Sequence, residues 1–356
     1  MMDAIGTKLV GAGGQKIVAV FIAGFAAAGL YLARPVFEPV AFALFTIALV
    51  WPLQRRLEAR IPRILAMVAT LVVTILVVSI VGFLIVWGVG QIGHWLLANV
   101  ARFQQLYQYA TAWLDGHGIF VSGIVFERFD VAWLIGFFNG VASRMNYLVG
   151  FSLLILIFTM LGLLEVGHFA EKLDAMSTNA AGRRPSQTAA LIAGKFRRYM
   201  VIRSLASVLT GLAIWLFAYL VGLELALAWG VISFALNYIP FIGPLVATLL
   251  ATGFAAIQFE SLQMAILVFV GLNIIQFLIG SYLEPSFAGA KLSISPFVVL
   301  FSVFFWGFLW GIPGAFIGVP LTIALITICA ERPSTRWVAQ LLSGPLTDTA
   351  EDTVAG

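Results

Sequence analysis

The chain has 356 residues, of which 62% are hydrophobic and only 10% are charged, and its mean hydropathy is +1.04. A water-soluble domain carries about 25% charged residues, because polar groups must cover its surface. This composition excludes an ordinary soluble globular protein. It predicts an all-α integral membrane protein covered by the lipid bilayer, since helices pair their own backbone groups inside the hydrocarbon core.

The formal net charge is +4 and the isoelectric point is about 9.3. The basic residues lie in loops beside apolar segments and form no basic face interleaved with aromatic residues, so we expect no nucleic-acid partner. Cys329 is the only cysteine. An intrachain disulfide and a cysteine-based metal site are therefore excluded.

About 20 apolar residues cross a 30 Å hydrocarbon core as a helix. Six segments approach or exceed this length: Ile17–Ala33, Val36–Trp51, Ile64–Trp87, Tyr147–Leu164, Leu205–Val221 and Met264–Tyr282. The first two are short, and Pro35 and Pro39 predict a tight helical hairpin between them. Arg34-Pro35 stands where a signal peptide would need a small-residue cleavage site, so we expect a retained first span.

Two further stretches, 225–258 and 295–330, are apolar throughout but too long for one straight span. The first is interrupted by Asn237-Tyr238-Ile239-Pro240-Phe241-Ile242-Gly243-Pro244 and the second by Gly311-Ile312-Pro313-Gly314. Each half is about 15 residues, or roughly 22 Å of helix, which is too short to span comfortably. Each stretch is predicted to be a broken helix or a re-entrant hairpin, which makes about eight hydrophobic helical stretches.

Basic residues predict the orientation. Four arginines accompany one acid, Glu58, after the second span, and seven basic residues against two acids fall within the loop 166–203. Excess Lys and Arg marks cytoplasmic loops. Both loops and the N-terminus are predicted to be cytoplasmic. The tail 331–356 is predicted to be cytoplasmic too, if both broken stretches cross the membrane or both re-enter it. The expected location of the protein is a bacterial inner membrane.

Residues 91–146 are predicted to form an extracytoplasmic helical insert between the N-terminal spans (1–90) and the transmembrane core (147–330). Its first part is amphipathic, with apolar residues at helical spacing opposite three glutamines. The apolar positions are Ile92, Trp95, Leu96, Phe103, Leu106, Ala110 and Trp113. Asp115-Gly116-His117-Gly118 ends this helix, and a second apolar helix is expected over 125–141. The two could lie in the interface, pack on the bundle or contact another subunit.

Motifs of enzyme chemistry are absent from the sequence. There is no HExxH, GxSxG or P-loop, and no aspartate lies within a predicted span. His94, His117 and His168 have no metal-ligand spacing. We therefore expect no enzyme, no cofactor and no metal site.

The interruptions carry the functional signal. Backbone freed by Pro and Gly at membrane depth is tolerated where it faces protein or a watery cavity, and paired discontinuous helices are the best sequence indication of a transporter's substrate site. The alternative is that these prolines merely kink packed helices. Within the sixth span, Asn273 and Gln276 share a helix face, and Glu284 with Pro285 ends it. Arg197, Arg198 and Arg203 are expected to snorkel at the cytoplasmic face, with a role in substrate binding as the alternative.

Asn237 to Pro244 resembles the N-[FY]-I-P-x-[IV]-G-P signature of the autoinducer-2 exporter family, the PerM-like permeases. The C-terminal pattern is similar too, through Leu283-Glu284-Pro285, Gly289, Leu292, Ser295-Pro296, Phe305-Trp306-Gly307, Gly311, Gly314 and Val319-Pro320-Leu321. The resemblance covers essentially the whole chain. It implies a transporter and a homo-oligomer, with a pentamer as one such assembly. In that family, some members are linked to export of autoinducer-2 and others to sodium/proton antiport.

We therefore expect an exporter of a small polar solute, with autoinducer-2 as one candidate and a proton or sodium ion as coupling ion. The path would be lined by the two breaks and the polar residues of the sixth span. The residues are Asn237, Tyr238, Pro240, Gly243, Pro244, Asn273, Gln276, Glu284, Pro285, Gly311, Pro313, Gly314 and Pro320. The alternatives are a cation/proton antiporter, for which only Glu165, Glu224 and Glu284 are near candidates, a passive oligomeric pore and a non-transporting scaffold.

Overall fold

The structure is a computed structural model that describes residues 21, 24, 25, 27–102, 105, 116, 131–176, 184–284, 286 and 294–343. Side chains are described for these residues except 131–139, 141–149 and 173. Within these ranges the named elements are all helical, and seven helices are long and apolar enough to cross a membrane. The predicted all-α membrane fold is confirmed.

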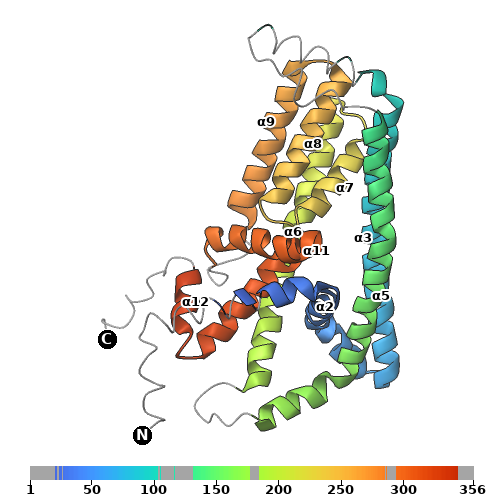
Figure 1. Cartoon of the computed structure of the whole chain (residues 1–356). Coiled ribbons are helices and arrows are strands. Elements are labelled where there is room, and N and C mark those ends of the chain that lie inside the picture. The colour runs from blue at the N-terminus through green and yellow to red at the C-terminus, as the bar shows by residue number, and fades with distance from the viewer. Residues whose placement is uncertain are drawn as a thin grey trace.

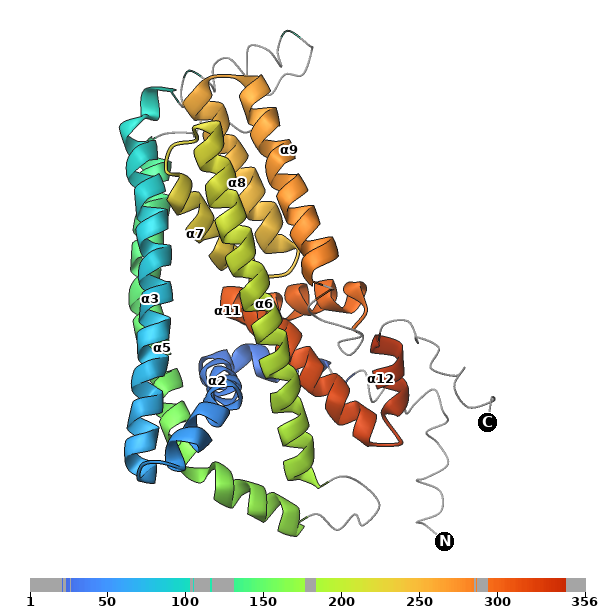
Figure 2. The same cartoon turned by 180° about the vertical axis from the view of Figure 1, so that it is seen from behind.

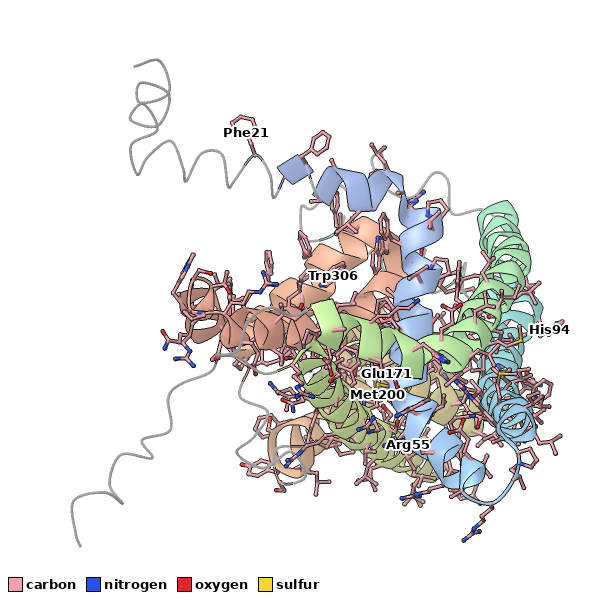
Figure 3. All side chains as sticks on the ribbon, turned by 90° about the horizontal axis from the view of Figure 1, so that it is seen from below. Phe21, Arg55, His94, Glu171, Met200 and Trp306 are labelled. Carbon is pink, nitrogen blue, oxygen red and sulfur yellow. The ribbon has the colours of Figure 1, made fainter. Side chains whose placement is uncertain are left out.

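The first two predicted spans are joined by a bend and not by a tight hairpin. Residues 27–32 are helical, Ala33 is a turn residue, and α2 spans Arg34–Glu58. The Ala33 N–H donates to the Gly29 carbonyl and the Phe37 N–H donates to the Ala33 carbonyl, so helical bonding reaches the break from both sides. Pro35 lies in the first turn of α2, where its missing N–H costs no hydrogen bond. Seen from below, Phe21 lies at the outer end of this first helical segment (Figure 3).

Helices α3 (Arg63–Ala98) and α5 (Val131–Met176) are longer than predicted and run side by side over most of the height of the bundle (Figure 1, Figure 2). Helix α3 passes through the predicted boundary at residue 90, so Ile92, Trp95 and Leu96 belong to it and not to a separate insert helix. Helix α5 likewise joins residues 131–141 to the fourth predicted span. The structure does not describe several other residues of the predicted insert, which are Phe103, Leu106, Ala110, Trp113, His117 and 125–130.

The predicted cytoplasmic loop 166–203 is helical at both ends. Helix α5 continues to Met176 and α6 spans Pro185–Val221. Ser186, in the first turn of α6, donates to Asp174 from its hydroxyl (2.6 Å) and its backbone N–H (3.0 Å). These bonds, the hydroxyl first, hold the pKa of Asp174 below its usual 3.8. The basic residues of this region therefore lie mostly on helices that are tied together near their ends.

Helices α7 (Ala226–Leu236) and α8 (Ile242–Phe259) form the first hairpin, and its break at 237–241 falls where the sequence predicts it. At its base, the Gln258 side chain accepts from the Glu224 backbone N–H (2.8 Å) and donates to the Gly222 carbonyl oxygen (2.9 Å). The Trp95 indole N–H of α3 donates to the Glu224 carboxylate. Both ends of the first hairpin therefore lie together, beside the C-terminal part of α3.

The second broken stretch is also a hairpin. Helix α11 (Pro296–Glu331) folds back on itself at Gly311, whose φ of 69° and ψ of −148° suit only glycine. The two arms touch closely: a Cβ on Gly318 would lie 2.9 Å from the Ser302 carbonyl oxygen, and the Trp306 indole N–H donates to Thr322 Oγ1 at 3.2 Å. We call Pro296–Glu331 the second hairpin. The short helix α12 (Arg336–Leu342) follows it.

The sixth predicted span is observed as α9 (Leu262–Leu278) followed by a single π-helical turn, η1 (Ile279–Leu283). A buried cluster including Trp229, Phe254, Val268 and Leu272 packs α9 against α6 and the first hairpin. A second cluster, which includes Phe196 and Trp306, joins α6 and α2 to the second hairpin. The two hairpins are thus packed on opposite parts of α6, and a space bounded by polar side chains lies between them.

Candidate functional site

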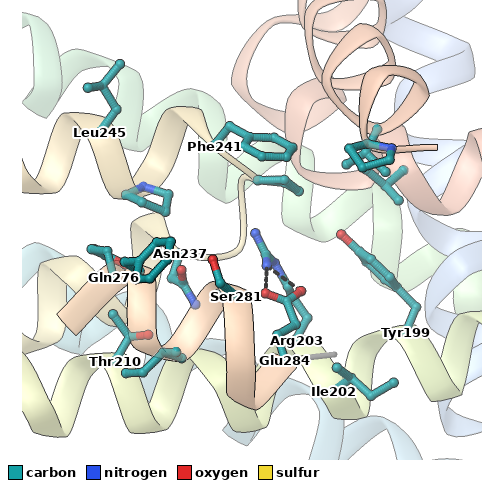
Figure 4. A pocket seen from close by; sticks show the side chains of 18 of the residues that line it. Tyr199, Ile202, Arg203, Thr210, Asn237, Phe241, Leu245, Gln276, Ser281 and Glu284 are labelled. Carbon is teal, nitrogen blue, oxygen red and sulfur yellow. Dashed lines mark hydrogen bonds and ion pairs between the residues drawn. The ribbon is translucent and has the colours of Figure 1, made fainter. Parts of the chain in front are cut away.

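A cavity of about 740 Å³ opens between the tip of the first hairpin, α6, the α9–η1 segment and the second hairpin (Figure 4). Its volume falls within the 300–1,000 Å³ typical of ligand pockets. The lining combines apolar side chains with a few polar groups that come from distant parts of the chain. These include Arg203 of α6, Asn237 of the hairpin tip, Gln276 of α9 and Glu284 just after η1.

The tip of the first hairpin turns sharply at Phe241, whose φ of 62° and ψ of −51° are rare for a residue with a side chain. The Ile242 N–H donates to the Pro240 carbonyl at 2.7 Å, which makes this a γ-turn of the strained kind. Such a conformation costs on the order of 1–3 kcal/mol, and strained residues cluster at functional sites. Here the strained residue lines the cavity, and 52% of its surface is exposed.

The arms of the first hairpin meet directly behind this turn. A Cβ on Gly243 would overlap the Leu236 carbonyl oxygen, so only glycine fits there. Two side chains fix the tip to α6: Asn237 Nδ2 donates to Ser207 Oγ at 3.2 Å and the Tyr238 hydroxyl donates to Ser204 Oγ at 2.9 Å. The segment from Asn237 to Pro244, which resembles the family signature, thus shapes one wall of the cavity and fixes it to α6.

A buried ion pair crosses the cavity wall. Arg203 Nη1 lies 2.7 Å from Glu284 Oε1 and 2.8 Å from Oε2. The Arg203 side chain is 6% exposed and that of Glu284 is 29% exposed. The prediction that Arg203 snorkels at the cytoplasmic face is therefore wrong, because α6 carries it to the cavity and Glu284 balances its charge.

Four buried polar atoms of the cavity wall have no hydrogen-bond partner in the described part of the chain. They are Tyr199 Oη, Arg203 Nε, Thr210 Oγ1 and Gln276 Nε2. Buried polar atoms in proteins are normally bonded, and leaving one unbonded costs about 1–3 kcal/mol. The four atoms around this cavity need hydrogen-bond partners that the described chain does not supply, and water or a bound molecule could provide them.

A sequence profile described as "AI-2E family transporter" matches residues 18–333. The chain belongs to the AI-2E family of transporters. The "AI-2 transport protein TqsA" of Escherichia coli is 28% identical over 324 residues, which cover 88% of this chain and 91% of the relative. A Borreliella burgdorferi protein named "Putative transport protein" is 37% identical over 187 residues, which is 51% of this chain and about half (52%) of that relative. A Haemophilus influenzae protein of the same name is 26% identical over 88% of this chain and 92% of its own length.

The family and the fold agree on the general function. This AI-2E family member is a multi-pass membrane protein of the permease type, with seven long apolar helices in its described part. A long apolar surface lies on α3, where Val72, Leu76 and Phe83 are 56%, 57% and 69% exposed. An exposed apolar helix face of this size fits contact with lipid.

The structure brings six of the predicted site residues together on the cavity wall: Asn237, Pro240, Pro244, Asn273, Gln276 and Glu284. Tyr238 and Gly243 lie behind the wall and support it. Pro285 lies outside the described residues. The break of the second hairpin does not reach the cavity, since the lining does not include Gly311, Pro313, Gly314 or Pro320. That hairpin instead contributes both arms, through residues such as Val299 and Val319.

This family member also has cavity residues that were not among the predicted site residues. Tyr199, Arg203 and Thr210 of α6 line the cavity, and so does Ser281 of η1. A helical-spacing signal was present, because residues 199, 203 and 210 fall on one face of a helix. The set of acids considered for a cation/proton antiporter was also incomplete, because it omitted Glu38 of α2, which is only 2% exposed. In the described residues no three His, Cys, Asp or Glu side chains are grouped as metal ligands.

Proposed function

We propose that this transporter exports a small polar solute through the cavity between the two hairpins, and that autoinducer-2 is the first solute to test. The observation that carries the proposal is the cavity itself: about 740 Å³, bounded by a strained hairpin tip, with four buried polar atoms that lack a protein partner. The relative named as an AI-2 transport protein supports the choice of solute, since it aligns over 88% of this chain.

The proposal includes a membrane arrangement. Each hairpin enters the membrane and returns to the side from which it entered, and the cavity lies between the tip of the first hairpin and the arms of the second. The closed base of the first hairpin at Gln258 supports this arrangement. The basic ends of α5 and α6 face the cytoplasm, and the base of the first hairpin faces the other side.

The test is flux of labelled autoinducer-2 in proteoliposomes that contain the purified full-length protein, with and without an imposed proton or sodium gradient. We expect gradient-dependent flux in the wild type. Asn237→Ala should reduce it at least about tenfold, because the hairpin tip loses its bond to Ser207. Asn99→Ala is the matched control, since the Asn99 side chain bonds the Trp95 carbonyl at 2.9 Å away from the cavity; it should leave flux unchanged.

Three results would contradict the proposal. Equal flux in wild type and Asn237→Ala would show that the solute does not pass through the cavity. Flux that needs no gradient of any coupling ion would favour a passive pore. Absent flux, in vesicles where a positive-control transporter works, would favour a scaffold.

A cation/proton antiporter remains the second candidate, because the structure adds a buried acid, Glu38, to Glu284. Sodium-driven proton movement in the same vesicles, measured with a pH-sensitive dye and no organic solute, identifies that activity. Glu38→Gln and Glu284→Gln would then both abolish it, whereas Glu171→Gln, on the exposed end of α5, would not.

A further inference from the structure

Helix α6 carries a row of polar side chains through an apolar span. Tyr199, Arg203, Ser207 and Thr210 follow one another at spacings of four, four and three residues, which places them on one face. The row is about 16 Å long, which is about half the thickness of a hydrocarbon core. Tyr199, Arg203 and Thr210 line the cavity, and Figure 4 shows Arg203 and Thr210 on either side of Asn237.

The hairpin tip divides this row. Asn237 donates to Ser207, so Tyr199 and Arg203 lie before that contact along α6 and Thr210 lies after it. Arg203 and Thr210 are buried, with 5% and 1% of their surface exposed. Each still has an atom without a partner: Nε of Arg203 and Oγ1 of Thr210. Buried polar groups that lack a partner in the described chain therefore lie on both sides of the Asn237–Ser207 bond.

The charges of the site restrict what can bind. Arg203 and Glu284 are the only charged residues in the described lining, and they neutralise each other. A bound anion would leave a net negative charge in a partly desolvated cavity, which is unfavourable unless it displaces Glu284. Arg203 Nε and Gln276 Nε2 can only donate hydrogen bonds, and the hydroxyls of Tyr199 and Thr210 can donate as well. The site is suited to a neutral molecule that offers several acceptor oxygens.

We propose that the polar row of α6 is the solute-binding wall, with one subsite at Tyr199 and Arg203 and a second at Thr210, separated by the Asn237–Ser207 contact. The bound solute is uncharged and rich in hydroxyl or carbonyl oxygens, and the Arg203–Glu284 pair stays closed while it binds. This assignment rests on the transport function proposed above.

Equilibrium binding to the purified full-length protein in nanodiscs tests the assignment without requiring transport. The probes are labelled D-glucose and labelled D-glucuronate, which share a pyranose ring and differ at C6, where one carries a hydroxymethyl group and the other a carboxylate. D-glucose should bind at least tenfold more tightly than D-glucuronate. Equal or tighter binding of D-glucuronate, or no binding of either probe, would overturn the assignment.

Hydroxyl deletions locate the site. Tyr199→Phe and Thr210→Val keep the side-chain shape and should each weaken D-glucose binding about 3- to 10-fold, the effect of one hydrogen bond. Thr159→Val is the matched control: Thr159 is fully buried in α5 with an unpartnered hydroxyl, but it does not line the cavity. It should bind as the wild type does, and an equal loss in all three variants would contradict a site on α6.

The two proposals can fail separately. If binding follows the expected pattern while proteoliposomes show no flux, the α6 assignment stands and the transport function fails. If flux is normal but Tyr199→Phe and Thr210→Val bind and transport as the wild type does, the α6 assignment fails and the transport function stands.

Discussion

Arg203 and Glu284 place opposite charges at one point of the cavity wall, and each depends on the other. When a buried charge loses its partner, no attraction offsets the cost of its desolvation. Removing one partner of a buried pair therefore destabilises a protein by about 3–5 kcal/mol. The cost here should fall at or below the lower end of that range, because the Glu284 side chain is 29% exposed.

The pair predicts strong coupling in a double-mutant cycle. Arg203→Met and Glu284→Met should each destabilise the protein, by about 2–3 kcal/mol. The double variant should be less destabilised than the sum of the two, because it leaves no unpaired charge. Thermal unfolding in detergent measures the four proteins; simple additivity would show that the two side chains do not interact.

At the scale of an element, the first hairpin depends on the close contact of its two arms at Gly243. Gly243→Ala places a Cβ against the Leu236 carbonyl oxygen and should force the tip open. We expect a loss of at least about 2 kcal/mol of stability, as for an overpacked core. Gly253→Ala is the control on the same helix: nothing lies within 4 Å of its Cβ position, so it should be neutral or stabilising by up to about 1 kcal/mol. A similar melting temperature for both variants would contradict the contact.

The junction of α5 and α6 should depend on pH. Because Ser186 lowers the pKa of Asp174 in the folded state, the ionised carboxylate stabilises the fold at pH values above its unfolded-state pKa of about 4. That stabilisation is lost as the pH falls through the lower, folded-state pKa. Asp174→Ala should therefore melt below the wild type at pH 7, and the gap should close in strongly acidic buffer. A gap that is the same at every pH would exclude this source of stability.

The elements also show what the sequence could and could not predict. Hydropathy located the long apolar segments, and Pro and Gly located both breaks, because chain composition largely determines these features. Hydropathy could not locate the ends of α3 and α5. A polar residue such as Gln91 lowers the local hydropathy, but the helix continues through it. Hydropathy also placed Arg203 at the membrane surface, because its partner Glu284 lies 81 residues away in the chain.

For the whole molecule, the arrangement of the helices predicts which ends share a side of the membrane. Single cysteines in a Cys329→Ser background report this through a membrane-impermeant thiol reagent. Glu224→Cys and Glu260→Cys, both exposed at the base of the first hairpin, should be labelled from the same side. Glu171→Cys, on the exposed end of α5, should be labelled from the other side. Labelling of Glu224→Cys and Glu260→Cys from opposite sides would mean that this stretch crosses the bilayer.

The closed base of the first hairpin also bears on how the chain is made. Gln258 holds the end of α8 against residues 222–224, and in the membrane arrangement proposed above the segment between them returns to the side from which it starts. The translocon would therefore insert α9 into the membrane in the same orientation whether or not that segment were present. We therefore expect that exchanging the first hairpin between homologues would alter the cavity wall and leave the membrane orientation of every later helix unchanged.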